Sequence, residues 1–419
     1  MIKQLDLSII GLGKLGASAL AAYASKNFKV VGFDKDNAIS KKIENCKNIY
    51  KEPNLSTYLK RFKNNINISY DLREIFLKTK ISLIILPTPS NKDGSFSLSY
   101  VKEFFVEIKN FKTLNKKNNH KFIIVSTTSP FSINNELVPY IEKILNLKEG
   151  KNFDVIYNPE FIALGSVLKD MLNPEFILVG INNKKNAQIM RNIYKKFIGK
   201  EKKVNFMNIE SAELTKLSFN AYVTMKLSFA NLLGVISHKN KKIQSKLISA
   251  TLGQSSRVSN KYFRPGLSFG GPCFPRDNKS YQHFFNKILK VKNPLSKATD
   301  EVNQQVEKLH LKEIKNRLNK LKNINELVII GSSFKENTPV ITKAFSLELI
   351  KSFKNKYRLY VYDTTDQIYL KKINDKIVYL DKLNINFLKN KFTIICHDTY
   401  PIVKKIKNIK KINFYNCWF

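Results

Sequence analysis

The chain has 419 residues, of which 43% are hydrophobic and 25% charged, a balance that indicates a soluble globular protein of two or three domains. Its net charge of +39 comes mostly from scattered lysines. The sequence has no basic motif interleaved with aromatic residues, so these lysines are expected on solvated faces rather than at a nucleic-acid-binding surface. The positive electrostatic field of the protein would still help to attract an anionic substrate. No apolar run reaches the roughly 18 residues that span a bilayer, so no membrane contact is expected. Four widely spaced cysteines, and five histidines without ligand spacing, predict no metal site and a reducing, cytoplasmic compartment.

The first stretch is typical of a dinucleotide-binding βαβ unit. An apolar strand over 5–10 leads into G-L-G-K-L-G, then a helical pattern, then a second strand that ends in Asp34. A lone G-x-G-x-x-G is weak, but these flanking elements make the signal strong over a plain βαβ turn. The helix N-terminus would receive the phosphates, and Asp34 would bind the ribose hydroxyls and repel a 2′-phosphate, which favours NAD over NADP. The loop residues expected at the cofactor are Gly11, Leu12, Gly13, Lys14, Leu15 and Gly16.

Three more apolar strands follow, and each leads into a polar residue. They are predicted over 81–86, 121–130 and 153–161. Strands that alternate with helices indicate a doubly wound parallel sheet, whose ligands bind beyond the carboxyl ends of the strands. Thr88, Thr127 and Glu160 stand at such ends and are therefore candidate site residues. Taken singly, each fits a turn or a helix cap equally well.

From about residue 207 the pattern changes to a long helix that is apolar at helical spacing. Lys216 and Asn220 lie four residues apart and therefore share one face of that helix. Such a pair is usually solvated, but the neighbouring residues are largely apolar, which favours a half-buried pair facing a cleft. A further helical stretch over 241–253 precedes the next motif.

The most distinctive motif is G-L-S-F-G-G-P-C-F-P-R-D-N-K-S at 266–280. Gly270 lies in a pair of glycines that lets the backbone approach a ligand closely, and prolines on both sides of Cys273 are expected to stiffen a loop. Arg276 and Asp277 follow directly. A thiol beside a cation and a carboxylate is a candidate covalent nucleophile. The alternative is a buried structural cysteine, since free cysteine is often buried.

A basic helix over 295–322 leads to a second α/β unit. Its strands are predicted over 326–331, 357–363, 392–398 and 411–416. The predicted fold is therefore α/β, with two Rossmann-like doubly wound parallel-sheet domains joined by a central long helix and helical segment. The expected domains are 1–203, 204–318 and 319–419.

Seven motifs in order resemble the UDP-glucose/GDP-mannose dehydrogenase family over nearly the whole chain. They are G-L-G-K-L-G, P-T-P at 87–89, S-T at 126–127, N-P-E-F at 158–161, K-L-S-x-N at 216–220, F-G-G-P-C-F-P-R-D at 269–277 and F-K-E-N-T at 334–338. The resemblance implies an NAD-binding domain, a central helical dimerisation and catalytic domain, and a nucleotide-sugar-binding domain. It implies oxidation of the C6 alcohol of a nucleotide sugar to a carboxylate in two NAD-dependent steps.

The resemblance also assigns roles. Cys273 would form a thiohemiacetal and then a thioester, and Lys216 and Asn220 would hold the oxyanion. Asp277 would activate water that Thr127 and Glu160 help to position. Thr88, Thr127 and Arg276 would lie at the cofactor. The substrate-binding residues implied are Glu160, Phe161, Lys216, Asn220, Arg257, Tyr262, Phe263, Arg264, Gly266, Gly270 and Lys335. Arg257 would reach the neighbouring subunit's substrate, which implies a homodimer.

Two departures from the family pattern concern the cofactor. Leu164 stands where the family commonly has Glu, and Thr342 replaces an Arg associated with the cofactor, beside Lys343. UDP-glucose is the first expected substrate, with GDP-mannose or a UDP-N-acetylhexosamine as alternatives. A hydroxyacid dehydrogenase would form one NADH per substrate instead of two, and a non-catalytic sugar-nucleotide-binding protein would form none.

Overall fold

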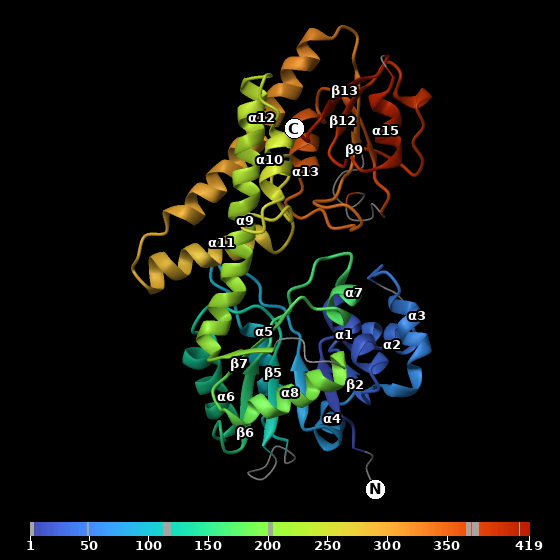
Figure 1. The fold of residues 1–419 in the computed structure, drawn as a ribbon. Helices are drawn as coiled ribbons and strands as arrows, with labels where there is room; N and C mark the ends of the chain where they lie inside the picture. The colour runs from blue at the N-terminus through green and yellow to red at the C-terminus, as the bar shows by residue number, and fades with distance from the viewer. Residues whose placement is uncertain are drawn as a thin grey trace. The chain divides into compact units, whose positions relative to one another are not determined.

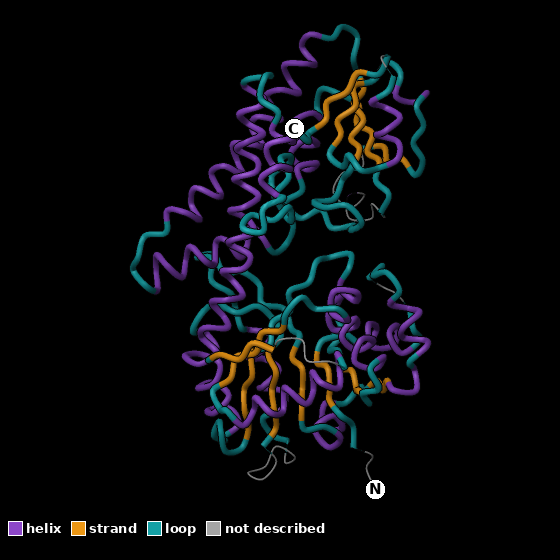
Figure 2. The backbone as a smooth tube through the Cα atoms, viewed as in Figure 1, coloured by secondary structure: helices purple, strands orange, loops and turns teal. Residues whose placement is uncertain are grey.

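The computed structural model describes residues 4–47, 50–111, 119–199, 204–365, 370, 377–409 and 411–419. The chain divides into two compact units, Met1–Ser218 and Phe219–Phe419, and each is described by itself. Figures 1 and 2 show one sheet in each unit, with helices around it. The prediction of three domains stays a prediction, and its boundary at residue 203 falls outside the described residues.

The first unit is built on an eight-stranded sheet in the order β3-β2-β1-β4-β5-β6-β7-β8. Its strands are β1 (Leu7–Ile10), β2 (Val30–Phe33), β3 (Ile66–Ile68), β4 (Ile81–Ile84), β5 (His120–Ile124), β6 (Phe153–Tyr157), β7 (Ile177–Ile181) and β8 (Val204–Met207). Neighbouring strands are parallel except β6 and β7, which are antiparallel. The expected doubly wound sheet is thus confirmed, with one reversed pair.

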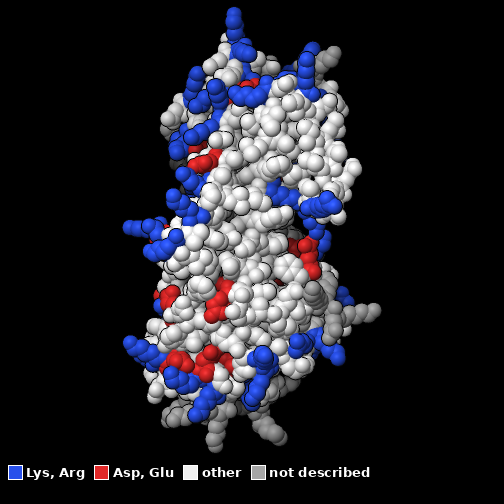
Figure 3. Space-filling model, turned by 60° about the vertical axis from the view of Figure 1, so that its left-hand side comes forward, with Lys and Arg blue, Asp and Glu red and all other residues white. Residues whose placement is uncertain are grey.

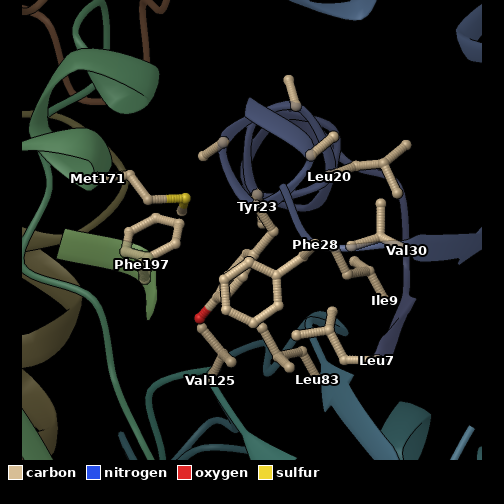
Figure 4. Packing of buried hydrophobic residues seen from close by; sticks show 14 of the residues in the cluster. Leu7, Ile9, Leu20, Tyr23, Phe28, Val30, Leu83, Val125, Met171 and Phe197 are labelled. Atoms are coloured by element: carbon tan, nitrogen blue, oxygen red, sulfur yellow. The ribbon is translucent and has the colours of Figure 1, made fainter. Parts of the chain in front are cut away.

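Helices cover both faces of this sheet because its strands are apolar on both sides. Their bounds are α1 (Lys14–Ser25), α2 (Asn37–Glu44), α3 (Leu55–Arg61), α4 (Leu72–Lys78), α5 (Ser99–Ile108), α6 (Val138–Leu145), α7 (Val167–Leu172) and α8 (Lys185–Ile198). One core joins α1, α7 and α8 to the sheet, and the other joins α4, α5 and α6 to it. In Figure 4, Leu20 and Tyr23 of α1 meet Ile9, Val30 and Leu83 of the strands. This packing fixes the start of α1 at the carboxyl end of β1.

The second unit carries a five-stranded parallel sheet in the order β11-β10-β9-β12-β13. Its strands are β9 (Glu326–Ile330), β10 (Arg358–Tyr362), β11 (Val378–Leu380), β12 (Phe392–Ile395) and β13 (Asn413–Asn416). The helices of this unit are α10 (Ser245–Gly253), α11 (Phe274–His283), α12 (Pro294–Lys320), α13 (Phe345–Phe353) and α15 (Pro401–Lys407). One face of the sheet packs on α12 and α13, and the other on α15. The predicted second Rossmann-like sheet is therefore confirmed.

The long helix α9 (Ile209–Lys239) has 31 residues and includes the division between the units at residue 218. It continues through Gly234. Among the described residues, no helix combines the length and apolarity needed to cross a membrane. On the face drawn in Figure 3, Lys and Arg side chains are scattered rather than gathered in one patch.

Candidate active site

The glycine-rich turn of the first unit is shaped for the close approach of a ligand. Gly11 has φ +92°, and a Cβ there would lie 2.4 Å from the Ile85 carbonyl oxygen. A Cβ on Gly16 would lie 1.8 Å from the Gly11 carbonyl oxygen, so α1 packs directly on the turn. A Cβ on Gly13 would meet nothing within 4 Å, and no side chain caps the helix that begins at Lys14. The first N–H groups of α1 therefore face a space that suits a dinucleotide pyrophosphate.

Asp34 joins the end of β2 to this turn. Its Oδ2 accepts a hydrogen bond from the Leu12 N–H at 2.7 Å, and its Oδ1 accepts one from the Asp36 N–H at 2.9 Å. The side chain is partly exposed, and an ionised carboxylate offers about four lone-pair sites. Acceptor capacity therefore remains for ribose hydroxyls, so the residues present fit NAD.

The other loop residues support this arrangement. Leu12 is buried and Leu15 packs against the core. The Lys14 ammonium lies 3.9 Å from the carboxylate of buried Glu52. Burial lowers the pKa of Lys14, and the Glu52 charge offsets part of that effect. Glu52 thus holds the Lys14 ammonium beside the glycine-rich turn.

Thr88 and Thr127 lie together after β4 and β5. The Thr88 hydroxyl donates a hydrogen bond to the Thr127 carbonyl oxygen at 2.7 Å, and Thr88 is buried. The Thr127 side chain is partly exposed. Thr88 therefore fixes the loop after β5, and the Thr127 hydroxyl is the more accessible group.

Glu160, Phe161 and Lys216 form a second group in the first unit. The Lys216 ammonium donates a hydrogen bond to the Glu160 carbonyl oxygen at 2.7 Å and lies 4.5 Å above the Phe161 ring. Burial raises the pKa of the Glu160 carboxyl to about 7, although the Lys216 charge opposes that rise. A carboxyl with this pKa exchanges protons readily near neutral pH. Leu164 is partly buried in the same loop.

Glu213 is a residue that we did not single out from the sequence. It is fully buried, one turn after the start of α9. Its Oε1 accepts hydrogen bonds from the Thr128 hydroxyl at 2.9 Å, the Ser132 hydroxyl at 3.1 Å and the Ile133 N–H at 3.1 Å. Burial raises its pKa to about 8. Glu213 thus ties the loop that carries Thr127 to the helix that carries Lys216.

In the second unit, Asn220 and Asp277 form a buried pair. The Asn220 amide donates a hydrogen bond to Asp277 Oδ2 at 2.5 Å, and Arg276 Nε lies 3.2 Å from Asp277 Oδ1. Asp277 is 1% exposed. An amide and a guanidinium thus orient one buried carboxylate.

Cys273 is exposed and forms no disulfide. It does not stand in a loop as the two prolines suggested. It is the N-cap residue of α11, and Pro275 lies in the first helical turn. Proline is tolerated there because the first N–H groups of a helix have no intrahelical partner. The N-terminus of a ten-residue helix stabilises negative charge on the sulfur.

The approach to Cys273 is packed against the segment 334–343. Gly271 has φ +85° and a Cβ there would lie 2.5 Å from the Phe334 ring, while a Cβ on Gly270 would lie 2.1 Å from the Lys343 carbonyl oxygen. The Gly271 N–H donates a hydrogen bond to the Thr342 carbonyl oxygen at 2.8 Å. The F-K-E-N-T motif and the cysteine motif therefore support each other, and Thr342 contributes through its backbone.

Polar side chains from α9 and α12 hold residues 266–269, which precede Cys273. The Asn231 side chain accepts from the Gly266 N–H at 2.8 Å and donates to the Leu267 carbonyl oxygen at 3.0 Å. Asn303 makes the matching pair of bonds to Phe269, at 2.7 and 3.0 Å. Ser268 donates to Glu307 at 2.8 Å. These anchors were not predicted, because isolated polar residues on a helix usually face water.

The remaining predicted substrate residues also belong to the second unit. Tyr262 is 46% exposed and adopts φ +57°, whereas Phe263 is buried and stacks on Phe229. Arg264 pairs with Asp398 at 2.5 Å. Arg257 and Lys335 are exposed. Gly266 contacts Trp418 closely.

The turn after β9 in the second sheet resembles the turn after β1 in the first, but the acidic residue beside it is not open. Gly331 after β9 has φ +94°, and Asp363 after β10 accepts from the Ser332 N–H at 2.7 Å, as Asp34 accepts from Leu12. Asp363 also accepts from the Tyr400 hydroxyl at 2.8 Å and the Thr365 N–H at 3.0 Å. It is 5% exposed. Asp363 is therefore engaged by its own chain and does not offer an open carboxylate to a ribose.

Two family models match the chain: the NAD binding domain of the UDP-glucose/GDP-mannose dehydrogenase family over residues 5–198, and its central domain over residues 210–305. The GDP-mannose 6-dehydrogenase of Pseudomonas aeruginosa is 27% identical over 363 residues, which are 85% of this chain and 80% of that protein. The UDP-glucose 6-dehydrogenase AglM of Haloferax volcanii is 28% identical over 358 residues, or 83% and 80%. A UDP-glucose dehydrogenase structure from Pyrobaculum islandicum shares the fold, with a TM-score of 0.88 at 24% identity over 100% of this chain and 95% of that one.

Proposed function

We propose that this chain, which belongs to the UDP-glucose/GDP-mannose dehydrogenase family, oxidises the C6 alcohol of UDP-glucose to a carboxylate through a covalent Cys273 intermediate. As a member it is an NAD-dependent oxidoreductase of the nucleotide-sugar dehydrogenase type. The observation that carries the proposed site is an exposed thiol at the N-terminus of α11, four residues before a buried carboxylate oriented by Asn220.

The turn 11–16 would hold NAD, which would supply a hydride acceptor for two successive oxidations. The first converts the C6 alcohol to an aldehyde, and a neighbouring base takes the hydroxyl proton. The Cys273 thiolate then adds to the aldehyde carbon and gives a thiohemiacetal, which loses the second hydride to become a thioester. Water attacks the thioester carbon, the C–S bond breaks, and the carboxylate and thiol are released.

The chain's own groups suit these steps. Lys216 and Asn220 lie one turn apart on α9 and would donate hydrogen bonds to the oxyanion that forms when sulfur or water adds. Asp277 would accept a proton from the attacking water. Glu160, whose pKa burial raises to about 7, would relay protons at neutral pH together with the Thr127 hydroxyl.

The sugar nucleotide has a second candidate, GDP-mannose, because curated relatives of both substrate classes match at similar identity. The test is a turnover screen with NAD and purified protein. UDP-glucose, GDP-mannose and the UDP-N-acetylhexosamines are supplied separately, and NADH is counted per sugar consumed. Two NADH per sugar with UDP-glucose supports the proposal, whereas one NADH indicates a simple alcohol oxidation. No NADH with any of them contradicts the proposed function.

We also propose that the active form is a homodimer in which Arg257 serves the partner's site. Apolar side chains on α9 recur at seven-residue spacing and remain exposed: Tyr222 is 57% exposed, Phe229 53% and Ile236 46%. On α10, Leu247 is 59% exposed and Leu252 41%. A band of large exposed apolar side chains on adjacent elements is typical of a protein interface.

A further inference from the structure

Two aromatic rings that follow β13 pack against glycines near the cysteine motif. A Cβ on Gly266 would lie 2.2 Å from the Trp418 ring, and a Cβ on Gly234 would lie 2.1 Å from the Phe419 ring. Side-chain atoms do not approach that closely, so both positions admit only glycine while the rings are in place. Gly234 lies on α9, and Gly266 begins the segment that leads to Cys273. The two rings therefore sit where α9 meets that segment.

Both rings are held in fixed orientations. The Trp418 indole N–H donates a hydrogen bond to the Cys396 carbonyl oxygen at 2.8 Å, beyond the end of β12. Phe419 stacks on the His310 ring with centroids 4.9 Å apart and an interplanar angle of 23°. His310 is buried and bonds the Gly266 carbonyl oxygen at 3.2 Å. The residue after β12 thus fixes Trp418, and His310 of α12 fixes Phe419.

Arg264 also contacts the Trp418 ring. Its guanidinium carbon is 4.3 Å from the centre of the Trp418 ring, and its Nη2 is 2.5 Å from Asp398 Oδ2. The Trp418 ring and the Asp398 carboxylate therefore hold the guanidinium together. The Arg264 side chain is 45% exposed, so it can still meet a ligand.

We propose that Trp418 is a positioning residue for the nucleotide sugar, which it serves by holding the Arg264 guanidinium in the orientation that meets the substrate. The proposal rests on the proposed function, in which Arg264 contacts the nucleotide sugar. Through Gly266, the same ring fixes where the segment toward Cys273 begins. Residues 418 and 419 lie outside all seven sequence motifs, so the role of Trp418 is inferred from its contacts in the structure alone.

The first test is a double-mutant cycle on substrate affinity. Trp418→Leu should raise KM for the nucleotide sugar about three- to thirtyfold, the range expected for a lost cation–π contact, and leave KM for NAD within twofold. Trp418→Phe keeps a ring face and should stay within about threefold of wild type. In an Arg264→Ala background, Trp418→Leu should add little, because the group through which it acts is gone.

The matched control is Phe387→Leu. Phe387 packs on Tyr360 at 5.0 Å and beneath Lys391 at 4.6 Å, a similar aromatic and cation contact in the core around α15. It should leave both KM values unchanged. An equal rise in nucleotide-sugar KM on Trp418→Leu with or without Arg264, or no rise at all, overturns the proposal.

A second measurement does not depend on the folding of the leucine variant. Trp418 is the only tryptophan in the sequence, so emission excited at a tryptophan-selective wavelength reports this site alone. Adding UDP-glucose or GDP-mannose to the wild type should change the emission, and Arg264→Ala should abolish that change. Turnover without any change in emission overturns the positioning role and leaves the proposed function intact. If the protein neither binds nor turns over any nucleotide sugar, the positioning role and the proposed function are both overturned.

Discussion

Glu213 offers the sharpest test of how the first unit is held together. Its Oε1 accepts three hydrogen bonds, and two of the donors, the Thr128 hydroxyl and the Ile133 N–H, belong to fully buried residues. Glu213→Leu leaves both donors without an acceptor, at about 1–3 kcal/mol each. We therefore expect a loss of roughly 2–6 kcal/mol in the free energy of unfolding of this unit. Glu213→Gln keeps an acceptor oxygen and should lose far less.

The raised pKa of Glu213 also predicts how the stability of the first unit changes with pH. Burial raises the Glu213 pKa to about 8 in the folded chain, whereas an unfolded Glu titrates near its ordinary value of about 4.3. Between these values the folded state binds more protons, so stability falls as pH rises, and the loss is complete above the folded pKa. The full loss is on the order of 5 kcal/mol. Glu213→Gln should remove this slope.

The assay is urea unfolding at pH 5, 7 and 9, with hydrogen exchange of peptides from the first unit as the readout. Tryptophan fluorescence would not report on this unit, because the single tryptophan lies in the second. Glu210→Gln is the matched control, because Glu210 lies one turn earlier and accepts from Asn134 at 2.6 Å in a partly exposed position. If wild type and Glu213→Gln show parallel stability profiles across this range, the carboxyl is ionised in the folded chain and the reasoning fails.

Three further predictions concern cofactor, substrate segment and assembly. Asp34→Ala should weaken NAD binding by about 1–3 kcal/mol in calorimetry, and equal turnover of NAD and NADP by the wild type would count against the assignment. Gly271→Ala should lower kcat, because its Cβ would lie 2.5 Å from Phe334, whereas Gly199→Ala, also at positive φ but in open space, should leave kcat unchanged. Mixing Arg257→Ala with Cys273→Ala should restore part of the activity, and a fully active monomer in sedimentation would exclude the shared site.

The sequence alone predicted those elements whose signal is local. G-L-G-K-L-G and Asp34 were found because the turn, the helix start and the following strand lie within one short stretch. Buried strands such as β4 and β9 were found because they are continuous apolar runs. The short edge strands β3, with I-N-I, and β11, with V-Y-L, were missed because they are only partly buried or interrupted by a polar residue. The strands β7 and β8 were not predicted either, and the antiparallel direction of β7 depends on pairing across the sheet, which no local pattern encodes.

The candidate site shows the same division. Lys216 and Asn220 were found through helical spacing, and Cys273 through its unusual neighbours. The local sequence around Glu213 is that of an ordinary solvated helix residue. Its burial comes from the loop after β5, which packs against it only in the folded chain. Trp418 was missed for a related reason, because its contacts with Gly266 and Arg264 span more than 150 residues of sequence.

The central claim is that Cys273 forms a covalent bond with the substrate. The most direct measurement is intact-protein mass spectrometry of Cys273→Ser after addition of NAD and the nucleotide sugar that the wild type oxidises. We expect that a serine ester, which hydrolyses slowly, accumulates as a sugar adduct on the protein. Cys273→Ala should carry no adduct and make no acid while still binding NAD. If Cys273→Ala makes uronic acid at the wild-type rate, with two NADH per sugar, the nucleophile lies elsewhere and the claim is contradicted.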